Sequence, residues 1–507
     1  MILKVRNIIK KSGEVMDVKD INGKPVNVPM MVITLIVGTF ITVLNQTILS
    51  TAFPTLMKAF DISTATVQWL STGFMLVNGI MIPVSAYLSA KVPSKWLYMS
   101  AMSTFFVGTL VAFVANSFGV LLAGRLIQAI GVGITMPLLQ NIMMSIFPPN
   151  RRGAAMGMAG IAIGVAPAIG PTLSGYVIDN FGWRVLFGMI LPIAALVILA
   201  AMFFFKNVLP LSNPKLDVPS LIESSIGFGA LLYGFSEVGN DGWGDPMVLG
   251  SIAVGLIFIV IFGYRQLHLK EPFVELRVFK SKIFALSTAL GTIANMAMVG
   301  VEMILPLYLQ IIHGKSALES GLTLLPGALL IAVMSPVTGQ VFDRIGAKRL
   351  AQLGLFFLTI ATLPYFFLTT NTPSIFITVI YAVRMFGISM VMMPLTTNGM
   401  NALTPDMIRH GTAVNNTVRQ VATSMTTAVL ISVLSNVTNL AKPAASLLKR
   451  NPLQYKQDFL NATLNGYHAA FLLAVGFSLV GWVLAFFLNS HAMSQEITIQ
   501  PEKKVKA

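Results

Sequence analysis

The chain has 507 residues, of which 55% are hydrophobic and only 10% are charged. Because a soluble protein of this length would carry about 25% charged residues, the composition excludes a soluble enzyme and predicts an all-α polytopic membrane protein. The sequence contains no cysteine, which excludes disulfides, thiol nucleophiles and cysteine metal sites.

Apolar segments of about 20 residues, long enough to cross a bilayer, recur along the chain. Residues 1–28 are polar and contain six Lys or Arg, without the layout of a signal peptide. After them the hydropathy pattern predicts fourteen spans, with ends good to a few residues, at 29–50, 66–90, 97–115, 119–146, 153–179, 185–206, 218–238, 247–266, 283–310, 317–341, 350–369, 374–398, 411–435 and 467–489.

The basic residues predict the orientation of these spans. With the N-terminus in the cytoplasm, 24 of the 34 Lys and Arg fall in cytoplasmic segments, seven fall outside and three lie within spans. The positive-inside rule then places both termini in the cytoplasm of a multi-pass cell-membrane protein. The net charge of +15 is therefore read as a topology signal and a match to anionic lipid heads, and a nucleic-acid partner is not expected.

A loop pattern occurs twice and predicts a duplicated fold. Residues 339–350 read GQVFDRIGAKRL, and a decayed copy at residues 86–97 reads AYLSAKVPSKWL, 253 positions earlier. An intramembrane Arg, a Pro and a basic-Gly step follow each copy, which is typical of transporters built from repeated halves. Spans seven and eight have no counterpart. The predicted divisions are a cytoplasmic tail (1–28), a six-helix bundle (29–206), an inserted hairpin (207–282), a second six-helix bundle (283–489) and a cytoplasmic tail (490–507).

Span four carries an arginine inside the membrane. Residues 124–137 read GRLIQAIGVGITMP, so Gly124, Gln128 and Thr135 share one helix face, and Arg125 adjoins it. A buried arginine is expensive in a bilayer, so Arg125 is expected to take part in proton coupling and Gln128 to line a cavity. The alternative is a structural arginine satisfied by backbone carbonyls of a neighbouring helix.

Span five carries small and kinking residues on one face. We expect Gly164, Pro167, Gly170 and Pro171 to form a hinge, because such residues allow close backbone approach and bending. The alternative is tight packing alone.

The intact loop copy places an acid beside basic residues at the predicted cytoplasmic face. Gly339, Asp343 and Arg344 are expected to form a gate that breaks when the halves rock. The alternative is a solvated turn that obeys the positive-inside rule.

Two acids lie inside predicted spans and are candidate proton carriers. Glu302 is roughly two turns from the outer end of span nine, and Glu223 is about one and a half turns inside span seven. An acid within a membrane is a functional hypothesis by default. The alternative for Glu302 is an interfacial acid exposed to water. Span thirteen begins GTAVNNTVRQ at residue 411, and its Asn415 is expected to line a vestibule, with interhelical hydrogen bonding as the alternative.

The sequence contains no His-acid metal cluster, Ser-His-Asp arrangement or Walker-type loop. We therefore expect no metal, no cofactor and no enzyme activity, and an ion gradient as the source of energy.

With these motifs, the chain resembles the major facilitator superfamily, in particular the fourteen-helix drug:proton antiporters close to the lincomycin-type multidrug exporters. The resemblance covers residues 29–489. It matches Arg125 to Pro137 with the fourth-helix motif, whose Arg is linked to proton transfer, and residues 166–175, APAIGPTLSG, with the antiporter motif of helix five. The resemblance implies the major facilitator fold, two six-helix bundles plus two inserted helices.

The chain departs from that family in two places. The first loop copy has Ala86 and Ala90 where the pattern has Gly and an acid. Many relatives have an acid at the position of Asn45 or Gln46, and here both are amides, so these two are expected to line the substrate cavity. Coupling is then expected at Glu302 and Glu223, and a weakly coupled transporter of neutral compounds is the alternative.

The predicted function is proton-coupled efflux of amphipathic drugs, cationic or zwitterionic, by alternating access in a monomer. The partners would be drugs or lipophilic cations, protons and the lipid bilayer. One alternative is export of an endogenous lipid or metabolite with incidental drug efflux. A membrane sensor or scaffold would need a sizeable soluble domain, and the predicted tails have about 28 and 18 residues.

Overall fold

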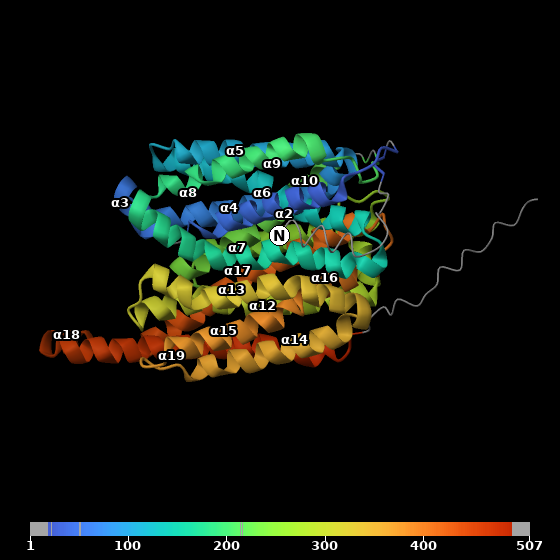
Figure 1. Ribbon diagram of the computed structural model, residues 1–507. Coiled ribbons are helices and arrows are strands. Elements are labelled where there is room, and N and C mark those ends of the chain that lie inside the picture. Colours follow the sequence, from blue (N-terminus) through green and yellow to red (C-terminus); the bar gives the residue numbers. More distant parts are fainter. Residues whose placement is uncertain (1–18, 22, 50–51, 213, 215, 489–507) are drawn as a thin grey trace, which may run out of the picture.

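The computed structural model describes residues 19–488 apart from residues 22, 50–51, 213 and 215. The described residues form helices that run roughly along one direction (Figure 1), and no strand lies among them. Thirteen of the described helices are long and apolar enough to cross a membrane, or fourteen if one bent pair counts as a single span. The all-helical polytopic fold is therefore confirmed. The tail at 490–507 and most of the tail at 1–28 lie outside the described residues.

The first six spans lie between residues 28 and 204. Ser63 and Ser117 cap the second and fourth of them, because each side chain accepts a hydrogen bond from a backbone N–H of the first turn. The helices are α2 (Val28–Thr47), the short connector α3 (Phe53–Phe60), α4 (Thr64–Lys91), α5 (Ser94–Phe113), α6 (Phe118–Ile146), η2 (Pro149–Arg151), α7 (Arg152–Phe181), α8 (Arg184–Gly188) and α9 (Ile190–Phe204).

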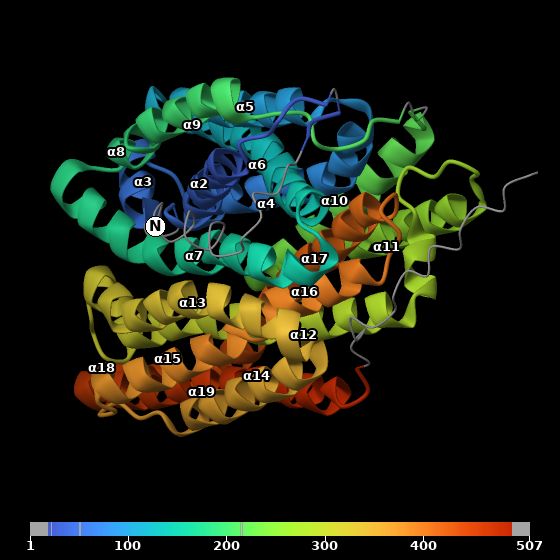
Figure 2. The same cartoon turned by 45° about the vertical axis from the view of Figure 1, so that its right-hand side comes forward.

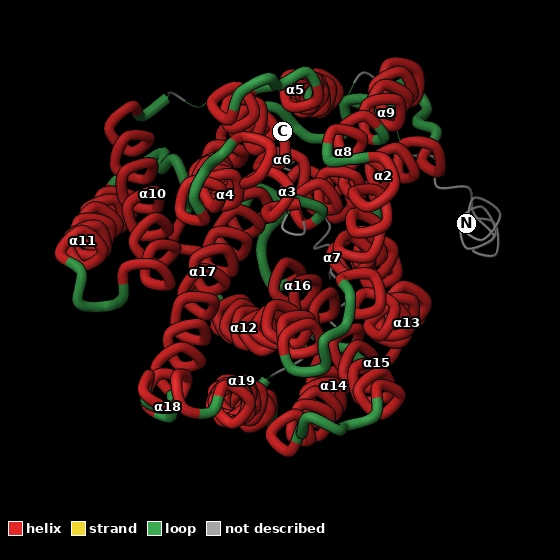
Figure 3. The backbone as a smooth tube through the Cα atoms, turned by 90° about the vertical axis from the view of Figure 1, so that its left-hand side faces the viewer, coloured by secondary structure: helices red, strands yellow, loops and turns green. Residues whose placement is uncertain are grey.

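A hairpin of two helices follows, α10 (Val218–Asp241) and α11 (Pro246–His268). It packs against α4 and α17 at the side of the molecule (Figure 3). Its base is held by Asp217, whose carboxylate accepts two hydrogen bonds of 2.8 and 2.9 Å from the Arg265 guanidinium. This cation holds the pKa of Asp217 below its usual range.

The last six spans extend from residue 282 to residue 485. A break at residues 390–391 separates α15 from α16, just before Pro394, which has no N–H to donate to a continuous helix. The elements are η3 (Leu276–Lys280), α12 (Lys282–Ile311), α13 (Ala317–Ile345), α14 (Ala347–Thr362), η4 (Leu363–Phe367), α15 (Ser374–Ser389), α16 (Met392–Asn401), α17 (Ile408–Leu440), α18 (Ala445–Arg450) and α19 (Pro452–Ala485).

Residues 436–466, which the hydropathy pattern leaves as an outside loop, are mostly helical. α17 continues to Leu440, and α19 begins at Pro452, where the Asn451 side chain accepts from the Gln454 backbone N–H. Figure 1 shows these ends and α18 projecting beyond the other helices. The expectation of a loop was wrong because hydropathy marks the apolar span, whereas a capped helix also persists in water.

The two sets of six helices form two groups that face each other (Figure 2). α7 of the first group packs along α13 of the second, and α4 and α6 contact α17. We call the end of the molecule with the turns at 91–94, 147–152 and 345–347 the basic face. The domain boundaries inferred from the sequence stay predictions.

Glycines bring the third and fourth spans of each group into close contact. In the first group, a Cβ added to Gly124 would lie 2.8 Å from the Ala112 backbone nitrogen. In the second group, a Cβ on Gly354 would lie 2.7 Å from the Gly387 carbonyl oxygen. Small residues at such crossings allow the van der Waals contact that replaces hydrophobic driving force in lipid.

We predict that Gly354→Val lowers the thermal unfolding midpoint of the purified protein in detergent, with a cost of about 1–3 kcal/mol from overpacking. Gly250→Val is the matched control, because no atom lies within 4 Å of a Cβ at that exposed position of α11. Equal midpoints for the two variants would contradict the proposed role of the close contact.

Candidate functional site

The contact between α7 and α13 is built on small residues along its length. A Cβ on Gly157 would lie 2.5 Å from the Ser335 carbonyl oxygen, and one on Gly164 would lie 2.8 Å from the Ile331 side chain. Gly339 packs directly on the backbone of Gly153. The two groups of helices therefore meet backbone to backbone.

The predicted hinge residues lie where α7 bends. The part of α7 that ends at Pro167 and the part that begins at Thr172 are inclined by 44°. Gly170 packs against the Thr47 side chain of α2. The side chain of Pro171 lies outside the described residues. α7 therefore shows both the bend that a hinge needs and the close packing of the alternative interpretation.

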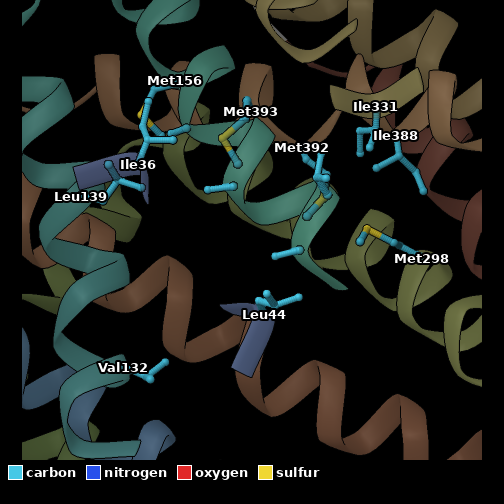
Figure 4. Packing of buried hydrophobic residues seen from close by; sticks show 14 of the residues in the cluster. Ile36, Leu44, Val132, Leu139, Met156, Met298, Ile331, Ile388, Met392 and Met393 are labelled. Carbon is cyan, nitrogen blue, oxygen red and sulfur yellow. The ribbon is translucent and has the colours of Figure 1, made fainter. Parts of the chain in front are cut away.

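Methionines surround the centre of the contact between the groups. Met392 and Met393 of α16 and Met298 of α12 lie near Ile331 and Ile388 (Figure 4). With Gly160 and Gly164 they line a cavity of about 20 Å³, which has room for about one water molecule. The flexible Met side chains that line this cavity can repack.

Arg125 lies fully buried in the first group of helices. Its Nη1 donates to the Asn45 carbonyl oxygen at 3.1 Å and to Gln128 Oε1 at 2.9 Å, and its Nε donates to the Leu70 carbonyl oxygen at 3.4 Å. The guanidinium also lies 4.2 Å from the centre of the Phe74 ring. These contacts bring together Arg125, Asn45 and Gln128. They include hydrogen bonds to backbone carbonyls of neighbouring helices, which are the partners that the alternative of a structural arginine predicts.

Some polar atoms around Arg125 have no partner. Arg125 Nη2 and both side-chain polar atoms of Asn45 are buried without a hydrogen bond. Gln46 lies half-buried on the same helix as Asn45. Unpaired buried polar atoms are costly, so this cluster can accept a further polar group.

Arg384 repeats this arrangement in the second group. Its Nη2 donates to the carbonyl oxygens of Ala297 at 2.6 Å and Met298 at 3.1 Å. Met298 is 253 positions after Asn45, the same interval that separates the two loop copies. Arg125 and Arg384 thus each bond the backbone of the first helix of their own group.

Glu302 lies one turn beyond Met298 on α12, close enough for its charge to interact with Arg384 and with Tyr381. Its Oε1 is buried without a hydrogen bond, as are Nε and Nη1 of Arg384 and the Tyr365 hydroxyl. The loop repeat predicts one intramembrane arginine after each copy, and Arg384 is the second of these, but the sequence carries no signal that places it or the tyrosines near Glu302.

Glu223 is apart from these clusters. It lies on α10, where its charge acts on Arg265 of α11. One of its carboxylate oxygens, Oε2, is buried without a partner. The structure therefore does not bring the two candidate proton carriers together.

Asp343 joins the two groups at the basic face. Its Oδ1 accepts from the Gly153 backbone N–H at 2.8 Å, and its Oδ2 accepts from Ala154 N–H at 2.9 Å. These donors begin α7, where a carboxylate satisfies unpaired N–H groups and complements the helix dipole. Arg344 is exposed, and Arg152 donates to Asn401 Oδ1 across the groups at 2.9 Å.

The decayed loop copy has no such carboxylate. The Ala90 carbonyl oxygen accepts from the Ser212 backbone N–H at 2.9 Å. A cavity of about 400 Å³ opens here, and its lining includes Ala86, Ala90, Asp406 and His410. The two copies therefore differ in structure as well as in sequence.

Residues 35–427 match the sequence profile of the Major Facilitator Superfamily. The chain belongs to this superfamily. It is 46% identical to the uncharacterized MFS-type transporter YcnB of Bacillus subtilis, over 92% of this chain and 97% of that protein. It is 38% identical to the lincomycin resistance protein LmrB of Bacillus subtilis, over 91% and 95% of the two chains. The crystal structure of the human organic anion transporter MFSD10 has a similar fold, with a TM-score of 0.64, 15% identity and coverage of 90% and 99%. The protein is thus a multi-pass membrane transporter rather than an enzyme.

We predict that Asp343→Asn opens the basic face more often, because the variant loses charge-assisted bonds worth about 1.5 kcal/mol, or about tenfold in the open fraction. The chain has no native cysteine, so Ser335→Cys, at a buried position of α13, reports opening through its rate of maleimide labelling. The exposed Arg349→Gln is the control. Unchanged labelling in Asp343→Asn would show that the carboxylate does not hold the gate.

Proposed function

We propose that the protein is a proton-coupled efflux transporter of amphipathic compounds, cationic or zwitterionic, that works by alternating access. The observation that carries the proposal is Glu302, a half-buried residue whose Oε1 is buried without a partner and whose charge interacts with that of Arg384. A carboxyl in a medium of low dielectric is stable when it is protonated or paired. Glu302 has both options, because it can bind a proton or rely on the nearby cation.

The proposed cycle uses the contacts between the two groups of helices. Asp343 and the α7–α13 contact close the basic face, which we place in the cytoplasm together with both termini. Bending of α7 near Pro167 and Gly170 then changes which side of the centre is open. Substrate would bind between the groups, near Asn45, Gln46, Gln128 and Asn415, and the Met side chains would adapt to its shape.

Coupling follows if proton and substrate bind in turn. Protonation of Glu302 from the outside leaves Arg384 without its compensating charge, and deprotonation toward the cytoplasm restores it. Arg125 would serve the same process in the first group, since it occupies the corresponding place. The relation to a lincomycin resistance protein supports drugs as substrates, and export from a cell membrane by a monomer is part of the proposal.

The proposal predicts that inside-out vesicles holding the purified full chain, acidic inside, accumulate a fluorescent cationic or zwitterionic dye. Accumulation should stop when an uncoupler collapses the pH gradient, because the gradient is the proposed energy source. Vesicles without protein are the control. Folded protein that moves no dye under the gradient would contradict proton-coupled drug efflux and favour an endogenous lipid or metabolite.

We further predict that Glu302→Gln abolishes gradient-driven accumulation while the protein is still expressed and folded, because an amide cannot exchange the proton. Glu223→Gln is the matched variant, an equally conservative change in the hairpin. Loss of coupling in Glu223→Gln alone would move the proton carrier to α10, and unchanged transport in both variants would exclude both acids.

A further inference from the structure

A third arginine lies inside the membrane at the contact between the two groups. Arg419 is on α17, which Figure 3 shows between α4 and α12. Three residues earlier on the same side of α17, Asn416 Nδ2 donates across the groups to Gln140 Oε1 of α6 at 2.8 Å. One residue later, the Gln420 side chain packs near Gly79 of α4. Arg419 therefore sits beside the surface where the two groups meet.

Arg419 is held in place by neutral groups. Its Nη2 donates to Asn295 Oδ1 of α12 at 3.1 Å, and Asn295 Nδ2 donates to Thr423 Oγ1 at 2.7 Å. Within the described part of the chain no carboxylate forms an ion pair with Arg419. In this respect Arg419 differs from Arg384, whose charge is near Glu302.

Two buried donors on α6 and α17, at the same contact between the groups, are also unused. Gln140 Nε2 and Asn415 Nδ2 have no hydrogen-bond partner, although these side chains are only 1% and 3% exposed. In the bond from Asn416 Nδ2 to Gln140 Oε1, the Gln140 Nε2 is the end of the amide left free. Asn415 lies one helical turn before Arg419, on the same face of α17. The free groups here are therefore a cation and N–H donors.

The facing group of helices has no acid that could complete this site. Residues 29–206 contain only two acids, Asp61 and Asp179. Asp61 ends α3, and Asp179 lies in the last turn of α7. Both are therefore at helix ends, whereas the Arg419 site lies inside the spans of α12 and α17.

We infer that Arg419, with Gln140 and Asn415, binds an oxyanion on the transported compound, either a carboxylate or a phosphate. A guanidinium and amide N–H groups are the donors that such a group accepts from, and hydrogen bonds to an ionised group are the strong ones. The inference rests on the proposed efflux function and narrows its substrates from cationic or zwitterionic amphiphiles to zwitterionic ones. A purely cationic compound would meet the Arg419 charge without compensation.

The test uses a matched pair of dyes, a rhodamine with a free carboxylate and its methyl ester, which is a cation of nearly the same shape. The purified full chain should bind the carboxylate dye more tightly than the ester, measured by fluorescence polarisation. Arg419→Gln should weaken binding of the carboxylate dye about tenfold or more, because a charge-assisted bond is lost. It should not weaken binding of the cationic ester, and Arg419→Lys should retain part of the preference.

Arg450→Gln is the control, because it removes the same charge from an exposed position of α18. Size-exclusion profiles establish that each variant is folded. Equal binding of both dyes, or a preference that survives in Arg419→Gln, would overturn the anion site. Gradient-driven accumulation of the dyes in vesicles is measured separately. If no dye accumulates but carboxylate binding depends on Arg419, efflux is refuted and the anion site is supported. If dye accumulates but carboxylate binding does not depend on Arg419, efflux is supported and the anion site is refuted.

Discussion

Hydrocarbon offers no partner to a polar group, and the placement of the three intramembrane arginines follows from this constraint. Arg125 and Arg384 solve it in the same way, since each donates to backbone carbonyls of the first helix in its own group. Arg419 is held by an asparagine on a neighbouring helix. The first two therefore tie each group together internally, whereas the third has donor capacity at the contact between groups.

The basic face is asymmetric. On one side Asp343 caps α7 and crosses between the groups. On the other side Ala90 stands where the pattern has an acid, and the segment after α11 spans the gap instead. In that segment the Phe273 ring stacks on the Tyr87 ring, with 6.0 Å between the ring centres. The Glu275 backbone N–H donates to His410 Nδ1 at 3.2 Å. A charged cap thus acts on one side, and a connector with an aromatic contact acts on the other.

Much of the fold could be predicted from the sequence, because hydropathy and the repeated loop are local signals. The span count, the inserted pair and the matched positions of Arg125 and Arg384 come from such signals. The partners of each side chain could not be predicted. The positions of Glu223 and Glu302 in the sequence do not show that the first lies in the hairpin apart from the arginines and that the second interacts with Arg384. The residues around Arg419 in the sequence likewise do not show that its partner is Asn295, 124 positions earlier. Those pairings arise only when distant helices pack.

Helix α12 connects the two sites proposed for proton and substrate. Asn295, which bonds Arg419, and Glu302, which lies near Arg384, are seven residues apart on α12, about 10 Å along one helix face. Met298, whose carbonyl oxygen binds Arg384, lies between them. A proton on Glu302 removes the attraction that helps to hold α12 against α15. Any resulting shift of α12 would move Asn295 as well, and with it the hydrogen bond that positions Arg419. In the proposed cycle, α12 would therefore be the physical route by which proton binding alters the substrate site.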